Sequence, residues 1–208
     1  HEAQLNVKLL SPLGITDEMS KDDIPELYGF HSEDTLTADC TSALDDSRFN
    51  LIIHPRSKGS AREWGLENYV QLLKLLPQDT FNVILTGTKE DGAAIRGNLF
   101  SDNPQLTDLS GKLDLDELIN FIGHADGLLG ASTGPLHIAS ALGKHAIGIY
   151  APMRPIHPIR WAPLGTLAKY FVLEKKCSDC KTDEKCACIV AITPEEVMSH
   201  LLECSKDN

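Results

Sequence analysis

The stretch Gly130-Ala-Ser-Thr-Gly-Pro-Leu-His-Ile-Ala-Ser-Ala-Leu-Gly143 decides the fold, because it joins a buried strand to the start of a helix. Residues 126–130 read as the end of an apolar strand, Ser132 or Thr133 suits a helix cap, and Pro135 suits the first helical position. Backbone N–H groups and the positive helix end would then converge at the carboxyl end of a strand. We therefore expect an anion-binding turn here.

Strand and helix patterns alternate on both sides of this turn, at the spacing of consecutive βα units. Such a chain is α/β, with a Rossmann-like, doubly wound, mostly parallel sheet that binds ligands beyond the carboxyl ends of its strands. The expected helices are about 64–76, 90–99, 113–124 and 195–202, and the expected strands are 51–54, 81–86, 106–109, 127–129, 146–150 and 170–173.

The first 50 residues differ from the rest. Residues 16–50 hold ten acidic and two basic side chains, a local net charge of −8, and one expected strand, 26–30. We interpret residues 1–50 as the remnant of a first domain followed by an acidic interdomain connector, and residues 51–208 as one Rossmann-like domain. Because the chain opens on His1, we also expect it to be a piece of a longer protein.

Composition limits the function classes. The 208 residues are 42% apolar and 24% charged, as in an ordinary globular protein, and no run reaches the roughly 18 apolar residues of a membrane span. The net charge of −11 argues against nucleic acid. Two segments, 51–62 and 150–162, nevertheless contain basic side chains and no acid. That pattern favours one small anionic ligand.

Several side chains beyond the expected strand ends suit a phosphate-bearing ligand. The loop after residue 54 supplies Ser57, Lys58 and Arg62, which could wrap a diphosphate. Glu90 follows Gly87, where a carboxylate can accept hydrogen bonds from ribose hydroxyls, and His137 lies in the first turn of the motif helix. Ordinary alternatives stay open: a solvated basic turn, a carboxylate that stabilises its own helix start, and a core histidine.

Two further motifs have rival interpretations. Gly130-Ala-Ser-Thr-Gly134 also matches the nucleophile elbow of serine hydrolases, with Ser132 as nucleophile and with partners drawn from Asp179 or Asp183 and His200. No oxyanion segment precedes it, and the basic loop would have no role. Four thiols fall within twelve residues and suit either a structural zinc or free thiols: Cys177, Cys180, Cys186 and Cys188.

Taken together, these residues make the chain from about residue 51 onward resemble glycosyltransferase family 9, the lipopolysaccharide heptosyltransferases, in their carboxyl-terminal nucleotide-sugar domain. The resemblance is carried by residues 113–126 and 132–143, by Arg62-Glu-Trp64, by Gly87-Thr-Lys-Glu90, and by the cysteine cluster running into Ile192-Thr-Pro-Glu-Glu-Val197. It implies the carboxyl-terminal half of a GT-B fold and a cytoplasmic enzyme, peripheral to the inner membrane, that binds ADP-heptose and needs no cofactor.

The resemblance also implies roles for the residues. Thr133, Gly134, Pro135 and His137 would contact the diphosphate and sugar, with Arg62 on a phosphate and Glu90 on the ribose. Many family members have Asp where this chain has Ser132, which bears on the choice of sugar. The implied reaction is inverting, metal-independent transfer to a lipopolysaccharide-core acceptor. The general base is expected in the missing first domain, so the fragment would be inactive alone. A non-catalytic nucleotide-binding module is the alternative.

Overall fold

Six parallel strands form the centre of the protein in a computed structural model that describes residues 1–33, 35–99, 103, 106–174 and 186–206. Their order is β3-β2-β1-β4-β5-β6, the doubly wound order, in which successive strands are added outward on one side of β1 and then outward on the other side, beginning with β4. The strands are β1 (Phe49–His54), β2 (Phe81–Leu85), β3 (Thr107–Asp108), β4 (Gly127–Ala131), β5 (His145–Tyr150) and β6 (Ala168–Val172). The predicted fold class is confirmed.

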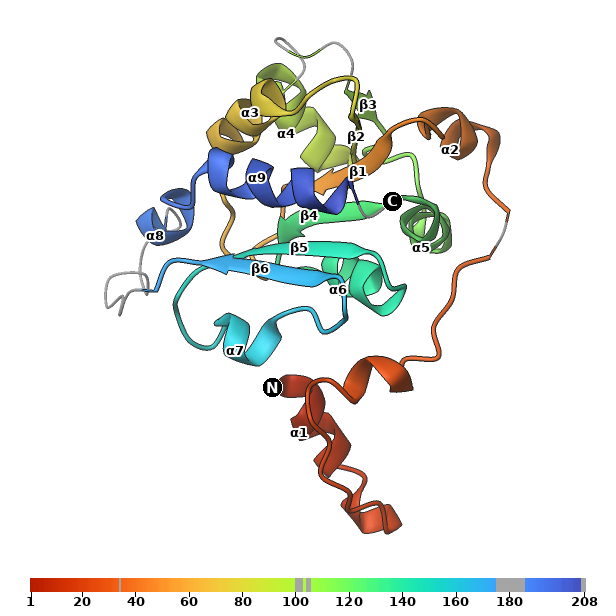
Figure 1. The fold of residues 1–208 in the computed structure, drawn as a ribbon, viewed down its shortest axis with the longest axis vertical. Helices are drawn as coiled ribbons and strands as arrows, with labels where there is room; N and C mark the ends of the chain where they lie inside the picture. Colours follow the sequence, from red (N-terminus) through yellow and green to blue (C-terminus); the bar gives the residue numbers. More distant parts are fainter. Residues whose placement is uncertain (34, 100–102, 104–105, 175–185, 207–208) are drawn as a thin grey trace.

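Helices cover both faces of this sheet (Figure 1). One face packs against α3 (Leu66–Leu75), α4 (Lys89–Leu99), α8 (Ala187–Val190) and α9 (Pro194–Cys204). The other packs against α2 (Ala38–Ala43), α5 (Leu115–His124) and α6 (Gly134–Ala141). Burial on both faces explains why the central strands carry apolar runs such as residues 51–53 and 83–85 rather than an apolar-polar alternation. Along β1, Leu51 and Ile53 enter the first core and Ile52 the second, as the alternation of side chains in a strand requires.

The beginning of the chain departs from expectation. No strand forms at residues 26–30; instead a 3₁₀ helix, η2, spans Ile24–Leu27. Pro25 suits the start of a helix and cannot donate to a strand ladder, which explains the wrong prediction. Helix α2 is part of the second core, where Asn82 Nδ2 donates to the Ala43 carbonyl at 2.8 Å. The predicted boundary at residue 50 falls inside β1, and the division into two units stays a prediction.

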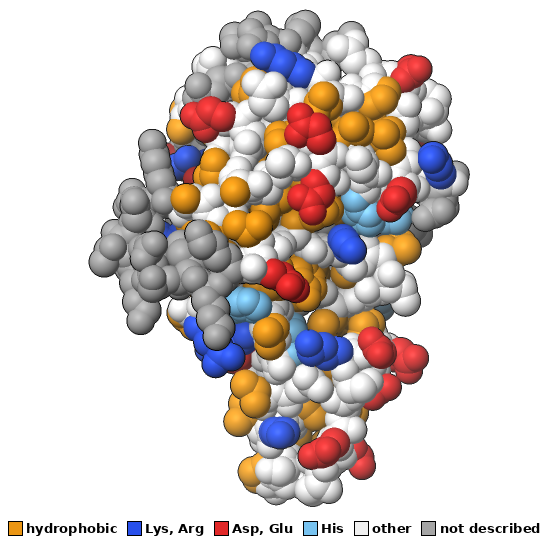
Figure 2. Space-filling view, turned by 60° about the vertical axis from the view of Figure 1, so that its left-hand side comes forward, with side chains coloured by type: hydrophobic (Ala, Val, Ile, Leu, Met, Phe, Trp, Pro, Cys, Tyr) orange, Lys and Arg blue, Asp and Glu red, His pale blue; other side chains and the backbone are white. Residues whose placement is uncertain are grey.

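Residues 1–30 project from the sheet domain (Figure 1) and form a narrow extension with acidic, basic and apolar side chains on its surface (Figure 2). This extension contains α1 (Glu2–Lys8) and a 3₁₀ helix, η1 (Ser11–Leu13). Its base contacts α7 (Pro158–Trp161), because the Glu2 carboxylate pairs with Arg160 at 2.5 Å and His1 Nε2 lies 2.9 Å from the Ala162 carbonyl. The extension is therefore attached to the domain beside α7.

Candidate functional site

The loops after β1 and β4 meet at the point where the strand order reverses. The chain leaves β1 toward α3 on one face of the sheet and leaves β4 toward α6 on the other, although the two strands are paired neighbours. Loops that diverge in this way leave a crevice between them, the usual ligand site of open α/β sheets. The two segments that the sequence singled out, residues 54–64 and 132–137, lie on either side of this crevice.

The turn into α6 has a bare amino terminus. Thr133 occupies the N-cap position with φ −133° and ψ 165°, and Pro135 is the second helical residue rather than the first. No side chain caps the helix, because the Thr133 hydroxyl donates to the Ala131 carbonyl at 3.3 Å instead. Thr133 thus occupies the predicted cap position but makes no capping hydrogen bond with its side chain. The backbone N–H groups of the first turn are left for a ligand or solvent.

The basic loop is organised around Glu63, a residue to which the sequence assigned no role. Its carboxylate accepts from the Ser57 backbone N–H at 2.9 Å and pairs with Arg56 Nη1 at 3.1 Å. Lys58 and Gly59 turn the chain with positive φ values of 50° and 82°, and Gly59 spares the strain of a side chain there. The loop thus presents its cations from a fixed turn.

Two adjoining pockets lie in the crevice. The larger, about 500 Å³, is lined by Met153, Ile156 and the basic loop from Arg56 to Glu63, which includes Ser57, Lys58 and Arg62. The smaller, about 250 Å³, shares Ser60 and Ile156 with it and is otherwise lined by Ser132, Thr133, Gly134, His137 and Trp161. The structure therefore brings the basic loop and the start of α6 to one site. Ser57 is itself buried, and its hydroxyl donates to the Ala61 carbonyl at 2.8 Å, within the loop.

A third pocket, of about 380 Å³, opens beyond β2 and β3. Its walls are largely apolar, with polar groups from His54 and the turn after β2, and it is lined by His54, Thr86, Gly87, Thr88, Lys89, Leu109, Gly111, Leu113, Asp114, Leu115 and Leu118. This pocket adjoins the basic loop in sequence, because His54, which lines the pocket, lies two positions before Arg56. Three pockets are thus distributed along one edge of the sheet.

Glu90 does not line this third pocket and is exposed on α4. The next residue, Asp91, is the carboxylate that organises the turn, since its Oδ2 accepts from the Thr88 backbone N–H at 2.9 Å and from the Thr88 hydroxyl at 2.7 Å. Burial would raise the pKa of Asp91, but the Thr88 bonds and the charges of Lys58 and Arg56 lower it overall. Asp91 is thus held ionised beside the cationic loop.

Both histidines of the crevice are kept neutral. Burial lowers the pKa of His54 to about 4 despite the opposing charge of Asp91, and His54 Nδ1 lies 3.0 Å from the Thr86 hydroxyl. Burial also lowers the pKa of His137, which lines the smaller pocket. A neutral imidazole near pH 7 can either donate or accept a hydrogen bond, so His137 can serve a ligand oxygen.

The serine hydrolase interpretation is not supported. His200, its proposed histidine, lies on α9, on the opposite face of the sheet from α6, where its ring packs edge to face on Phe171 with the ring centroids 6.0 Å apart. Ser132 instead hydrogen-bonds with Tyr150.

The proposed zinc ligands are only partly described. Cys186 and Cys188 are buried at the start of α8 in the first core, whereas Cys177 and Cys180 lie outside the described residues, as do Asp179 and Asp183. Within the described ranges, no group of three or more potential ligands is close enough to hold a metal ion. The zinc site stays a prediction.

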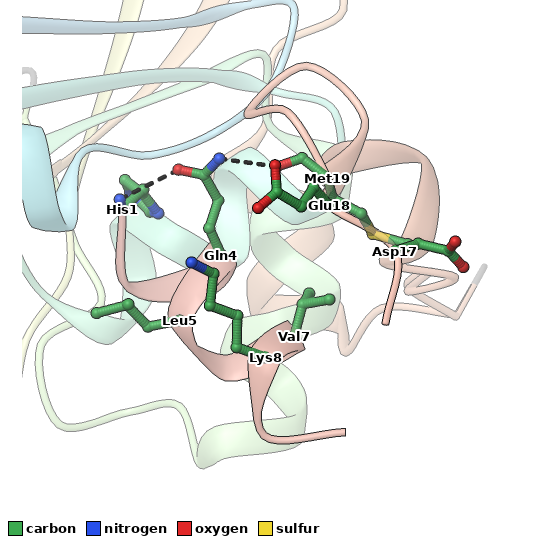
Figure 3. A pocket seen from close by; sticks show the side chains of 8 residues that line it. All are labelled: His1, Gln4, Leu5, Val7, Lys8, Asp17, Glu18 and Met19. Atoms are coloured by element: carbon green, nitrogen blue, oxygen red, sulfur yellow. Dashed lines mark hydrogen bonds between the residues drawn. The ribbon is translucent and has the colours of Figure 1, made fainter. Parts of the chain in front are cut away.

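A separate pocket of about 220 Å³ lies in the amino-terminal extension (Figure 3). It is formed between α1 and residues 17–19, and Gln4 closes it by donating to the Met19 carbonyl at 2.8 Å and accepting from the His1 amino group at 3.2 Å. No strand of the sheet reaches this pocket, so it has none of the strand-end groups that make the crevice suitable for an anion.

Comparison with known proteins decides the family. The model of glycosyltransferase family 9 (heptosyltransferase) matches residues 4–189. The chain belongs to this family. Among curated relatives, it is 31% identical over 126 residues to the lipopolysaccharide core heptosyltransferase OpsX of Haemophilus influenzae, covering 60% of this chain and 35% of the relative. It is 26% identical over 162 residues to lipopolysaccharide heptosyltransferase 3 of Escherichia coli, covering 72% of this chain and 44% of the relative.

Solved structures of the family share the fold. The family 9 glycosyltransferase of Veillonella parvula superposes with a TM-score of 0.76 at 17% identity, covering 100% of this chain and 60% of that chain. The E. coli ADP-heptose heptosyltransferase II gives 0.65 at 22% identity, covering 85% and 54%. This family 9 chain therefore spans between 35% and 60% of the length of these four proteins. In its described part, no helix combines the length and apolar character needed to cross a bilayer.

Proposed function

We propose that this chain is the donor-binding half of an inverting heptosyltransferase and that it holds ADP-heptose along the carboxyl edge of its sheet. One observation supports this most directly: the cationic loop after β1 and the uncapped start of α6 line adjoining pockets that share Ser60 and Ile156. A diphosphate seated there would meet backbone N–H groups, a positive helix end and basic side chains together.

The three pockets suit the three parts of the donor. The apolar pocket beyond β2 and β3, with Leu109, Leu113 and Leu118, suits an adenosine. The pocket of the basic loop suits the diphosphate, and the Nε of Arg56, which is buried and has no hydrogen-bond partner in the described ranges, is one donor that a phosphate oxygen would complement. The smaller pocket, with Ser132 and His137, suits the sugar.

The proposed chemistry is displacement of ADP from the anomeric carbon by an acceptor hydroxyl. Negative charge grows on the departing diphosphate as that bond breaks. Arg62, Lys58 and the α6 amino terminus would stabilise this charge more in the transition state than in the ground state, without reorganising. We assign the acceptor to the lipopolysaccharide core, the general base to a first domain, and the site of action to the cytoplasmic face of the inner membrane.

A thermal-shift panel of ADP, UDP, GDP and ADP-heptose tests the proposal. A ligand at 100 times its dissociation constant stabilises the fold by about 2.7 kcal/mol, which corresponds to roughly 5–10 °C for a chain of this size. We expect ADP and ADP-heptose to give such shifts and UDP and GDP to give smaller ones. If neither adenine ligand shifts the melting temperature of the folded protein at millimolar concentration, the proposal fails.

Two substitutions separate the phosphate contacts from the sugar contacts. Arg62→Ala should weaken ADP and ADP-heptose equally, by about tenfold for one lost charge-assisted contact. Ser132→Asp should leave ADP binding similar and change the preference among ADP-sugars. Arg96→Ala is the control, since Arg96 pairs with Asp108 and lines none of the three pockets. Equal loss of ADP and ADP-heptose in the Ser132→Asp variant would contradict this division.

A further inference from the structure

The smaller pocket of the crevice is lined by both polar and apolar side chains. Ser132, Thr133 and His137 supply polar groups, and Ile156 and Trp161 supply apolar surface from the segment after β5. A pyranose has the matching character, with hydroxyls around its rim and C–H groups on its faces. Trp161, to which the sequence assigned no role, is the larger of the two apolar side chains.

Tyr150 links a residue of the polar group to a residue of the apolar group. It is the last residue of β5 and is 1% exposed, and its hydroxyl donates to the Trp161 carbonyl at 2.6 Å. Burial raises the pKa of Tyr150, and a hydrogen bond with Ser132 partly opposes that rise, so the phenol keeps its proton. The buried Tyr150 side chain therefore hydrogen-bonds both to Ser132, before α6, and to the backbone of Trp161. Its ring is itself held edge to face by Tyr170 at 6.1 Å.

The backbone of Trp161 is held by hydrogen bonds, its side chain packs against the second core, and its indole N–H is an available donor. Trp161 ends α7, whose N-cap His157 accepts from the Ile159 N–H at 3.2 Å, and the Arg160 guanidinium lies 5.3 Å from the indole ring. In the part of the chain that the structure describes, the indole N–H has no hydrogen-bond partner. Tryptophan in such a pocket offers a sugar both an apolar surface and one polar group.

We propose that Trp161 is a specificity-determining residue for the sugar of the donor, a pyranose joined to a nucleoside diphosphate, and that Tyr150 is the positioning residue that holds Trp161 at the pocket shared with Ser132. The inference rests on the proposed function, because that function assigns the sugar to this pocket. It adds a residue that recognises the sugar without touching the phosphates. Removing the indole should therefore cost affinity for the sugar donor alone.

Calorimetric titration of ADP and of ADP-heptose separates these effects. We expect Trp161→Ala to weaken ADP-heptose at least tenfold while the dissociation constant of ADP changes less than twofold. Trp161→Phe should retain part of the affinity, because it keeps an apolar ring and loses the N–H. Tyr150→Phe should weaken ADP-heptose three- to tenfold and leave ADP unchanged. Ile159→Ala, an exposed neighbour on α7, is the control and should change neither ligand.

Fluorescence gives a second readout. The chain has two tryptophans, and Trp64 is fully buried with its N–H bonded to the Ile192 carbonyl at 2.9 Å. ADP-heptose should therefore change the emission of the wild type but not that of Trp161→Phe, and ADP should change neither. Equal weakening of both ligands by Trp161→Ala, or no weakening of either, would overturn the inference. Failure of ADP to bind the wild type would instead refute the proposed function.

Discussion

At the scale of single residues, Glu63 carries the geometry of the basic loop. Its carboxylate holds both the Ser57 N–H and the Arg56 guanidinium. Glu63→Gln keeps an acceptor but removes the charge, so we expect a loss of about 1–2 kcal/mol in the free energy of unfolding and three- to tenfold weaker ADP binding. Urea denaturation and ADP titration measure the two effects. Glu67→Gln, at an exposed position on α3, should change neither the free energy of unfolding nor ADP binding. Equal losses in the two variants would contradict the role of Glu63.

His54 makes stability depend on pH in a predictable direction. Its pKa falls from the ordinary 6.5 to about 4 on folding. Between pH 4 and 6.5, His54 is therefore protonated in the unfolded chain and neutral in the folded one. Because of this difference, the free energy of unfolding is unaffected by His54 well above pH 6.5 and decreases as the pH falls toward 4, by about 2 kcal/mol at pH 5. His54→Asn should remove this part of the loss. Urea unfolding of both proteins at pH 7.5 and 5 tests it, and parallel losses would contradict it.

Residue spacing explains what could be predicted about the site and what could not. The sequence located the basic loop and the α6 turn correctly at one edge, because loops after parallel strands share that edge. The role of Glu90 at the ribose stays a prediction, since neither Glu90 nor Asp91 lines the third pocket, and it is Asp91 that organises the turn there. The Thr88-x-x-Asp91 spacing, a capping pattern, was the signal available in sequence. Glu63 and Tyr150 act through tertiary contacts that sequence alone does not show.

At the scale of helices and strands, apolar runs located every strand of the sheet, while their ends were set by pairing. β1 begins at Phe49, two residues before expectation, because Phe49 pairs with Phe81 of β2. β3 shrinks to Thr107–Asp108 at the sheet edge. Helix α3 starts at Leu66 and not at Trp64, since Gly65 precedes it with a φ of 95° that only glycine adopts readily. Trp64 instead fills the first core.

Two glycines of α4 separate helix propensity from packing. A Cβ on Gly92 would lie 2.6 Å from the Ser110 Cβ, whereas a Cβ on Gly97 would meet nothing within 4 Å. Gly97→Ala should therefore stabilise the protein by roughly 0.5–1 kcal/mol through helix propensity. Gly92→Ala gains the same propensity but should destabilise by about 1–2 kcal/mol net, because α4 must move from the segment after β3. Urea unfolding compares the two variants. Stabilisation by both would show that Ser110 moves aside at little cost and would contradict the predicted loss.

At the scale of the whole molecule, charge and apolar surface are unevenly distributed. Most of the net negative charge lies before residue 51, while the crevice carries the basic loop, so the field favours an anion at the sheet edge. Residues 1–30 expose many large apolar side chains beyond the domain, including Leu5, Leu9, Leu13, Leu27 and Phe30. The placement of this extension depends on contacts such as Glu2 with Arg160, which join positions 158 residues apart and leave no periodic signal in sequence.

The composition of the crevice predicts binding without turnover for this chain alone. Inverting transfer needs a base near the acceptor hydroxyl. Among the residues lining the proposed sugar pocket, His137 is the one ionisable side chain, and burial lowers its pKa, which makes it a weak base. We therefore expect residues 1–208 to bind ADP-heptose and release no ADP above spontaneous hydrolysis when a lipopolysaccharide-core acceptor is added, as chromatography of the nucleotide would show. Acceptor-dependent ADP release that His137→Ala abolishes would place the base in this chain and refute the assignment to another domain.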